Sequence, residues 1–368
     1  MKNKPFLIYL LQIQILLFCF FSCAYKFPSP YRGAQPTSKQ PHNRSICSGL
    51  SYNVPNSFEV FPYWGYPDSK VIGYELPHDT VVSEFFQNEM KGQVPYGYHH
   101  PQNLYPGAVW VGVNKLMDEA EVSNISWREF LFYIRRDSSE SYYRQMIPDE
   151  AAQPVDGYAT NPFYYFFPVV GIRYEQVIAY CRWRTEIANR SLESAKPFEG
   201  ALPKQKIRVT YRLPTEKEWE TYAACGLDMI KYPYGVKFSS TRMKIRPKAA
   251  SYLQFLNNLP QSKKQIKKDI RSFNRNKQEH VFFYVKRNDV PYFLQSKSPF
   301  YIFNIPINNY GLYNIVGNVS EMVAEQGIAK GGSYLDALEA CKLKNQFHYS
   351  KALPNLGFRT LCEVHPLD

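Results

Sequence analysis

The 368-residue sequence lacks the cysteine and histidine patterns that hold structural zinc. It contains no two cysteines separated by two residues, and its seven histidines are scattered apart from the neighbours His99 and His100. Structural zinc sites use four closely spaced cysteine or histidine ligands, and adjacent side chains in a strand point to opposite faces. We therefore expect neither a zinc site nor a histidine-bound metal centre.

Acidic residues are also few, because 32 Asp and Glu stand against 44 Lys and Arg and leave a formal net charge of +12. Residues 261–287 hold nine basic residues against Asp269 and Glu279, so this segment alone supplies +7. A general nucleic-acid binder presents a basic face built from many elements. Since the excess charge is local, we expect no nucleic-acid partner.

The basic segment has two interpretations. It is either a solvated helical insertion or a docking strip for an acidic protein, a lipid headgroup or a cell-wall polymer. The residues that would form the docking strip are the basic residues at its start: Lys263, Lys264, Lys267, Lys268 and Arg271.

The overall composition excludes disorder throughout the chain. Apolar residues make up 45% and charged residues 21%, close to globular averages, and the length allows one large or two ordinary domains. Aromatic residues reach 16%, with 30 Tyr, 25 Phe and 5 Trp. We therefore expect a core packed largely from rings.

The N-terminus has the pattern of a secretory signal. Lys2 and Lys4 precede an apolar run over residues 5–21 that is short for a membrane span. Ser22 before Cys23 resembles a bacterial lipobox, in which the cysteine is acylated and becomes the mature N-terminus. The alternatives are an ordinary signal cut nearby and an uncleaved anchor.

The lipobox interpretation predicts a signal peptide over residues 1–22, lipid on Cys23, and a tether with an N-terminal extension over residues 23–105. The residues after Cys23 lack the acidic cluster that resembles surface-export signals in some gliding bacteria. We therefore expect an outer-membrane lipoprotein that faces the periplasm.

Periodic segments begin after the extension. Residues 109–113 have the pattern of a buried strand, and residues 126–129 have the spacing of a capping box that opens a helix through about residue 135. Apolar spacing predicts a second helix around residues 177–187, and a further capping box at 215–218 predicts a third through about residue 224. Helices among many turns and aromatic residues favour an α+β fold with much irregular structure.

Five separated segments carry a resemblance to a known family. They are Tyr-Arg-Leu-Pro-Thr-Glu-Lys-Glu-Trp-Glu at 211–220, Tyr-Pro-Tyr-Gly at 232–235, Asn-Tyr-Gly-Leu-Tyr-Asn-Ile-Val-Gly-Asn-Val-Ser-Glu at 309–321, Gly-Gly-Ser-Tyr at 331–334 and Leu-Gly-Phe-Arg at 356–359. Together they resemble the formylglycine-generating-enzyme (sulfatase-modifying factor) domain, whose fold is related to C-type lectins. The resemblance implies such a domain over residues 106–368, with a basic insertion at about 236–306 that matches little.

A narrower resemblance lies inside this domain. Residues 167–171 and 174–186, together with Ile-Pro-Asp at 147–149, resemble the gliding-motility lipoproteins of Bacteroidota, which belong to the type IX secretion machinery. The lipobox agrees with this subgroup. The resemblance implies a lipid-anchored scaffold that binds other envelope proteins of a gliding or type IX secretion complex.

The same family comparison bears on catalysis. Its oxidase members bind copper through two cysteines, and the resemblance places these positions at Asp336 and Cys341. A carboxylate is a hard ligand and does not replace a thiolate for Cu(I). We therefore expect no copper and no enzyme activity. The alternatives are a copper-dependent formylglycine-generating thiol oxidase and a lectin-like protein that binds glycan or peptidoglycan.

The resemblance also implies a structural calcium ion. Its ligands would be the side chains of Asn314 and Glu321 with the backbone oxygens of Gly317 and Val319, and oxygen donors from one tight segment suit this hard cation. The alternative is that Asn314 and Glu321 only stabilise a turn. The resemblance further implies a disulfide that joins Cys181 to Cys362.

Overall fold

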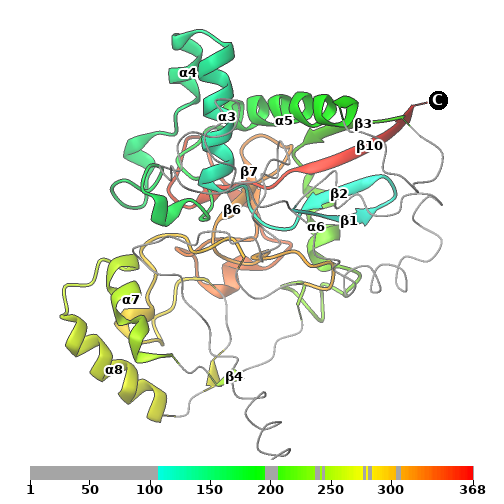
Figure 1. Cartoon of the computed structure of the whole chain (residues 1–368). Helices are drawn as coiled ribbons and strands as arrows, with labels where there is room; N and C mark the ends of the chain where they lie inside the picture. The colour runs from blue at the N-terminus through cyan, green and yellow to red at the C-terminus, as the bar shows by residue number, and fades with distance from the viewer. Residues whose placement is uncertain are drawn as a thin grey trace, which may run out of the picture.

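The computed structural model describes residues 107–194, 206–236, 241–242, 245–276, 279–280, 284–303 and 308–367. The predicted signal peptide, Cys23 and the N-terminal extension to residue 105 lie outside these residues. Among the described helices, none combines the length and the apolar character that crossing a membrane requires. Helices and strands alternate with long irregular stretches, which confirms the predicted α+β class (Figure 1).

Two four-stranded sheets organise the described part of the chain. In the first sheet all neighbouring strands are antiparallel, and their order is β1 (Ala108–Gly112), β2 (Lys115–Asp118), β10 (Leu361–Leu367) and β3 (Lys206–Arg212). The second sheet has the order β8 (Phe347–His348), β7 (Ile328–Lys330), β6 (Ser320–Met322) and β9 (Leu356–Gly357), of which β6 and β9 run parallel. A separate two-stranded ladder pairs β4 (Thr241–Arg242) with β5 (Glu279–His280).

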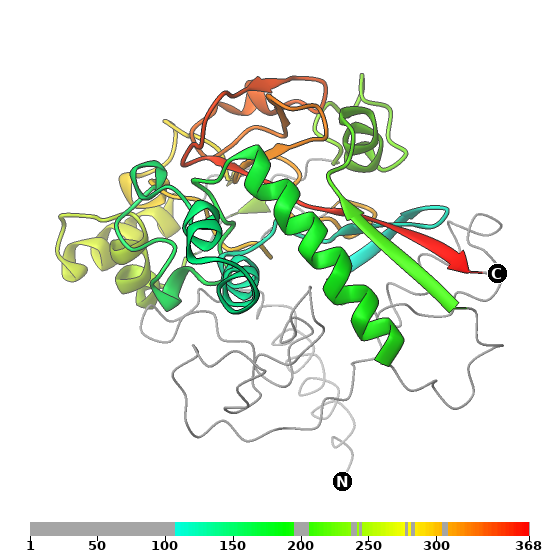
Figure 2. The same cartoon turned by 90° about the horizontal axis from the view of Figure 1, so that it is seen from above.

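A long helix covers the first sheet. Helix α5 (Tyr174–Ser194) runs across the first sheet and packs on β3, as the view from above shows (Figure 2). The other α-helices are α3 (Asn124–Asp137), α4 (Glu140–Met146), α6 (Glu216–Ala224), α7 (Ala250–Leu256) and α8 (Lys263–Arg275). Short 3₁₀ turns are η3 (Glu150–Ala152), η4 (Pro162–Tyr164), η5 (Pro247–Ala249), η6 (Tyr292–Leu294) and η7 (Leu338–Cys341).

One predicted helix start is right and one is wrong. Thr215 and Glu218 form the predicted capping box of α6, in which each side chain accepts a hydrogen bond from the other residue's backbone. Helix α3 begins earlier than predicted, because Ser123 rather than Ser126 is its N-cap. Ser123 forms an isolated β-bridge with Pro168, and this pairing keeps its backbone extended at the N-cap position.

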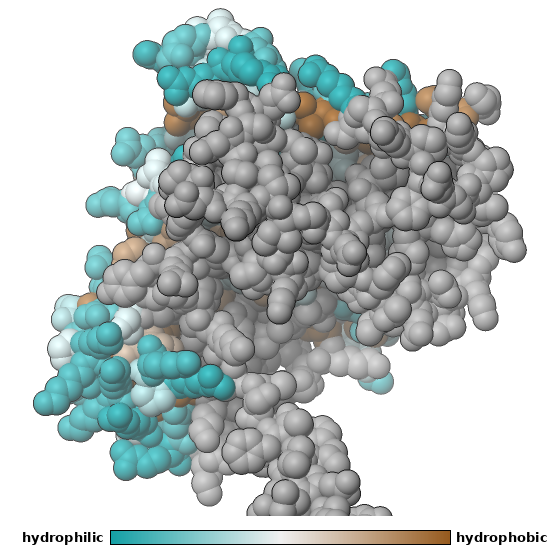
Figure 3. Space-filling view, in the orientation of Figure 1, coloured by the Kyte–Doolittle hydropathy of each residue, from teal (hydrophilic) through white to brown (hydrophobic). Residues whose placement is uncertain are grey.

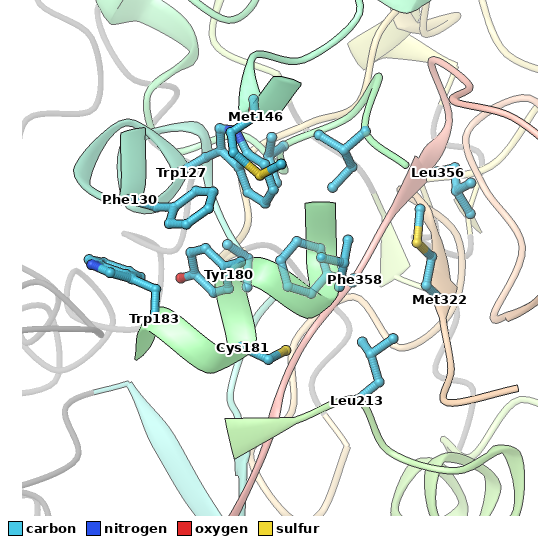
Figure 4. Close-up of a cluster of buried hydrophobic side chains, with 14 of the residues drawn as sticks. Trp127, Phe130, Met146, Tyr180, Cys181, Trp183, Leu213, Met322, Leu356 and Phe358 are labelled. Carbon is cyan, nitrogen blue, oxygen red and sulfur yellow. The ribbon is translucent and has the colours of Figure 1, made fainter. Parts of the chain in front are cut away.

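Rings fill the core, as the composition predicts. In the cluster between α3 and α5, Trp127 stacks on Tyr180 at a centroid distance of 5.5 Å, and Phe358 meets both rings edge on (Figure 4). A second cluster surrounds Trp219 on α6. Aromatic pairs in these geometries contribute about 0.5–1.5 kcal/mol each beyond the burial of their area.

The insertion packs onto the domain through a third cluster. Ile266 and Ile270 of α8 are fully buried and lie in one cluster with Leu253 of α7 and the aromatic residues Phe163 and Phe167. Both views place α7 and α8 at the end of the described structure that is remote from the first sheet (Figures 1 and 2). The insertion is therefore attached by an apolar face and exposes its opposite face.

The implied disulfide is absent from the structure. Cys181 and Cys362 are both free and both buried. Cys181 on α5 lies in the cluster that contains Met322, whereas Cys362 on β10 lies in a separate cluster with Leu116 and Val209. Each thiol occupies its own apolar cluster, and burial raises the pKa of each to about 12.

Candidate functional site

The segment after β7 contains Asp336 and Cys341, the two positions at which the family resemblance implies the copper ligands of the oxidase members. It begins with Gly331 and Gly332, whose φ angles of 83° and 68° lie in the left-handed region. A Cβ atom on Gly332 would lie 2.3 Å from the Sγ of Cys341, so only glycine fits this close approach. Gly332 thereby brings the backbone of this loop against Cys341, whereas Gly331 lies against Ile315 and Trp219.

Asp336 is turned back onto its own loop. Its carboxylate accepts a hydrogen bond from the hydroxyl of Ser333 at 2.5 Å, and its backbone N–H donates to the Ser333 carbonyl at 3.1 Å. Asn355 donates to the Ser333 hydroxyl at 3.0 Å. Asp336 therefore stabilises a turn in which Ser333 is buried and Leu335 is exposed.

Cys341 is a protonated thiol inside the fold. It is fully buried, its Sγ donates to the Ala337 carbonyl at 3.4 Å, and it packs against Gly332. Burial raises the pKa of Cys341 to about 12, and the nearby charge of Asp336 acts in the same direction. The thiolate is the form that binds metal, and this environment disfavours it.

These residues do not fit the copper site of the oxidase members. A two-coordinate Cu(I) site requires two soft thiolates, whereas this loop offers one buried thiol and one carboxylate that is hydrogen-bonded to Ser333. The described residues also include no group of three or more His, Cys, Asp or Glu side chains that could hold a metal ion.

Glu321 lies at a junction of three of the motifs that carry the resemblance. Its carboxylate, 1% exposed, accepts bonds from Arg359 at 2.5 and 2.7 Å and from the Trp219 indole at 2.7 Å. Arg359 also donates to the Tyr313 carbonyl at 2.8 Å. The motifs around 219, 321 and 359 thus meet in a buried ion pair that holds the fold together.

Asn314, the other side chain predicted to bind calcium, does not contact Glu321 through its hydrogen bonds but contacts Glu121 and Ile302. Asn314 donates through its amide to the buried carboxylate of Glu121 at 3.1 Å and to the Ile302 carbonyl at 2.9 Å. Burial raises the pKa of Glu121 to about 8, and the charge of Glu321 adds to this rise. Sequence reasoning missed Glu121, because nothing in its local pattern distinguishes it from the neighbouring Glu119.

The residues of the predicted calcium site are therefore poorly arranged to bind a calcium ion in this structure. Gly317 and Val319 lie in the tight segment between the two side chains, and Gly317 has a φ of 80°. The bond from Asn314 to Glu121 uses the amide nitrogen and not the oxygen that would bind calcium, but Arg359 already neutralises Glu321. A calcium ion would have to compete with that ion pair for the carboxylate.

Two further buried ion pairs tie the sheets to the helices. Lys330 of β7 is fully buried and donates to Glu216 at 2.9 Å and to Glu220 at 2.8 Å, both on α6. Arg184 on α5 donates to Asp118 at 2.8 Å. These partners are 66 or more residues apart, so the sequence alone carried no signal for them.

The predicted docking residues lie together on α8. The side chains of Lys263, Lys264, Lys268 and Arg271 are exposed, and that of Lys267 is half-buried. A shallow hollow elsewhere on the surface is lined by Glu140, Ser141, Arg144, Gln145 and Arg173. It includes none of the predicted site residues.

Comparison with known proteins identifies the domain. The family model described as "Sulfatase-modifying factor enzyme 1-like domain" matches residues 92–364. "Inactive C-alpha-formylglycine-generating enzyme 2" from Bos taurus is 29% identical over 181 residues, which cover 47% of this chain and 40% of that protein. "Formylglycine-generating enzyme" from Mus musculus is 25% identical over 225 residues, which cover 54% of this chain and 45% of that protein.

The chain thus spans less than half the length of both curated relatives. Among solved structures, PvdO from Pseudomonas aeruginosa is similar with a TM-score of 0.40 and 14% identity, over 69% of this chain and 82% of that one. A likeness at this identity concerns the fold alone.

Proposed function

The chain belongs to the family of Sulfatase-modifying factor enzyme 1-like domains, and we propose that it is a non-catalytic member that acts as a lipid-anchored scaffold of the cell envelope. The observation that carries the proposal is the donor set at the copper position. Asp336 is bonded to Ser333, and Cys341 is a buried, protonated thiol. One relative is itself described as inactive, which supports the idea that this fold persists without oxidase chemistry.

The residues of the shared motifs support a structural role. Trp219, Glu321 and Arg359 meet in a buried ion pair, and Lys330 anchors β7 to α6. These side chains have their hydrogen-bonding groups engaged within the protein, so they hold loops in place without needing a substrate.

The proposed partners are envelope proteins of a gliding-motility or type IX secretion complex, and the proposed location is the periplasmic face of the outer membrane. The sequence resemblance at 167–171 and 174–186 supports the partners, and the lipobox at Ser22 and Cys23 supports the location. Peptidoglycan is the alternative ligand, and a pull-down with purified sacculi separates the two.

The absence of oxidase chemistry is tested with Cu(I). We expect the purified chain to lose a competition for Cu(I) against a chromogenic chelator and to consume no O₂ with a cysteine-containing peptide. The variant Asp336→Cys restores a second thiol and should bind Cu(I) more tightly, whereas Cys341→Ala should match the wild type. Tight Cu(I) binding with O₂ consumption by the wild type would overturn the proposal.

The scaffold role is tested in cells that lack the protein. Cys341→Ala should restore gliding or secretion as well as the wild type does, because the thiol has no chemical role. Pull-downs from detergent-solubilised envelopes should recover secretion-channel or gliding components with both proteins. A Cys341→Ala protein that is folded and abundant but does not complement would contradict the role.

A further inference from the structure

The exposed face of α8 carries a concentrated positive charge. Residues 245–276 contain eight basic residues and one acid, Asp269. At 100° per residue, the six basic residues of α8 fall within an arc of about 140°, separate from the arc of about 40° that holds its buried residues Ile266 and Ile270. These six are Lys263, Lys264, Lys267, Lys268, Arg271 and Arg275.

Neighbouring residues extend this surface. The 3₁₀ turn η5 packs against α8 and adds Lys248, which is exposed, and Arg246, which is half-buried. We call these two residues and the six of α8 the basic face. Figure 3 shows hydrophilic residues gathered where α8 and α7 lie in Figure 1.

The single acid of this segment does not neutralise the basic face. Asp269 accepts hydrogen bonds from the Tyr292 hydroxyl at 2.7 Å and from Gln265 at 2.8 Å. Among the residues that the structure describes, no ion pair involves a member of the basic face. Eight like charges kept together repel one another, which an anionic partner would relieve.

The apolar side of α8 is not available to that partner. Ile266 and Ile270 are fully buried against α7 and the third core cluster. The face can therefore make electrostatic contacts with a charged surface, but α8 cannot insert apolar side chains into a bilayer without detaching from the domain. This chemistry suits a layer of phosphate headgroups, because such a layer presents many negative charges in a plane.

We infer that the basic face binds the anionic lipid headgroups of the membrane to which the chain is anchored. The inference rests on the proposed function in one respect, that Cys23 carries lipid. Eighty-three residues separate Cys23 from Gly107, the first described residue, so the chain is long enough for the domain to reach that membrane. A lipid chain combined with a polybasic face gives two attachment signals, which hold a protein at a membrane more firmly than one.

The test measures membrane binding through the basic face in the absence of the lipid anchor. The chain from residue 23 onward, carrying Cys23→Ser and hence no lipid, is sedimented with vesicles of phosphatidylcholine alone or of equimolar phosphatidylcholine and phosphatidylglycerol. We expect binding only to the second vesicles, and a steep loss of binding as salt screens the charges. Replacing the five residues Lys263, Lys264, Lys267, Lys268 and Arg271 by Gln should weaken binding by about fivefold per residue.

The matched control removes the same amount of positive charge from other parts of the surface. It replaces five exposed basic residues outside the basic face by Gln, namely Arg182, Lys217, Lys231, Lys342 and Lys351. The thermal transition of each variant verifies folding. The control should retain most of the vesicle binding.

Three results would overturn the inference: equal binding to both kinds of vesicle, equal losses in the two variants, or no vesicle binding by the parent chain. If the parent chain instead binds peptidoglycan sacculi and ignores vesicles, the basic face serves a wall polymer. None of these results affects the non-catalytic proposal, because that proposal is measured by Cu(I) binding and O₂ consumption.

Discussion

At the scale of single residues, charged side chains in the segments that carry the family resemblance hold the fold together. Glu218 shows how. It caps α6 through Thr215 and accepts charged hydrogen bonds from Arg212 of β3 at 2.7 and 2.8 Å and from Lys115 of β2 at 2.6 Å. Burial opposes its charge, but these partners outweigh burial and hold the pKa of Glu218 well below its usual range.

Glu218 therefore predicts an acid-sensitive stability. A carboxyl whose pKa is lowered by folding stabilises the fold above its unfolded pKa, here 4.5, and this contribution is lost as the pH falls further. Glu218→Gln should cost about 1–2 kcal/mol at neutral pH, after allowance for solvent screening, and should lose less stability on acidification than the wild type. Urea unfolding across this pH range measures both effects.

The control for this prediction is Glu150→Gln, since Glu150 is exposed at the first turn of η3. It should follow the wild-type curve. If Glu218→Gln showed the same acid dependence as the wild type, the assignment of that dependence to Glu218 would be wrong.

The pair of Glu321 and Arg359 gives a second prediction at this scale. Arg359→Met leaves a buried carboxylate without its cation and should cost about 3–5 kcal/mol. Adding Glu321→Gln to Arg359→Met should recover part of this loss, because the buried charge is removed. Denaturant unfolding of the two single variants and the double variant measures the coupling energy.

The same pair predicts the effect of chelation. Since Arg359 neutralises Glu321, we expect EDTA to leave the Tm unchanged. A lower Tm in EDTA that Ca²⁺ restores would instead support the calcium ion that the family resemblance implies.

At the scale of elements, α8 is held in place by the burial of its apolar side against the domain. Ile270 is fully buried against the third cluster, so Ile270→Ala should cost about 2–5 kcal/mol. The damage should concentrate in α7 and α8, which hydrogen exchange of their amides would show. Lys268→Ala on the exposed side is the control, and it should change neither stability nor exchange. Loss of protection across both sheets would mean that the insertion belongs to the central core.

At the scale of the whole molecule, attachment is predicted to depend on residue 23. Cys23→Ser should move the protein from the membrane fraction to the soluble fraction after a high-salt wash, which removes electrostatic binding through the basic face. Cys47→Ser changes another cysteine of the N-terminal region and should leave the protein membrane-bound. Retention of Cys23→Ser protein after the wash would favour an uncleaved anchor.

Local features were predictable from the sequence because their contacts span a few residues. The capping box at 215–218 depends on hydrogen bonds within one turn, and the structure has it. The strand expected at 109–113 lies at Ala108–Gly112, and it is buried at alternate positions instead of throughout. The predicted start of α3 was wrong because Ser123 and Ser126 both offer a hydroxyl that can cap a helix. Ser123 became the N-cap because it pairs with Pro168 and because the backbone of Asn124 donates to Phe167. Both partners are distant in sequence.

The family motifs, the aromatic excess and the carboxylate at 336 were properties of the sequence itself. They determined the family, the ring-rich core and the mismatch with a two-thiolate copper site, because each depends on residue type and order. Only the tertiary structure decided that Cys181 and Cys362 lie in separate clusters, that Arg359 neutralises Glu321, and that α8 turns its basic side outward. These outcomes depend on which distant segments share a buried space, and no local pattern encodes that choice.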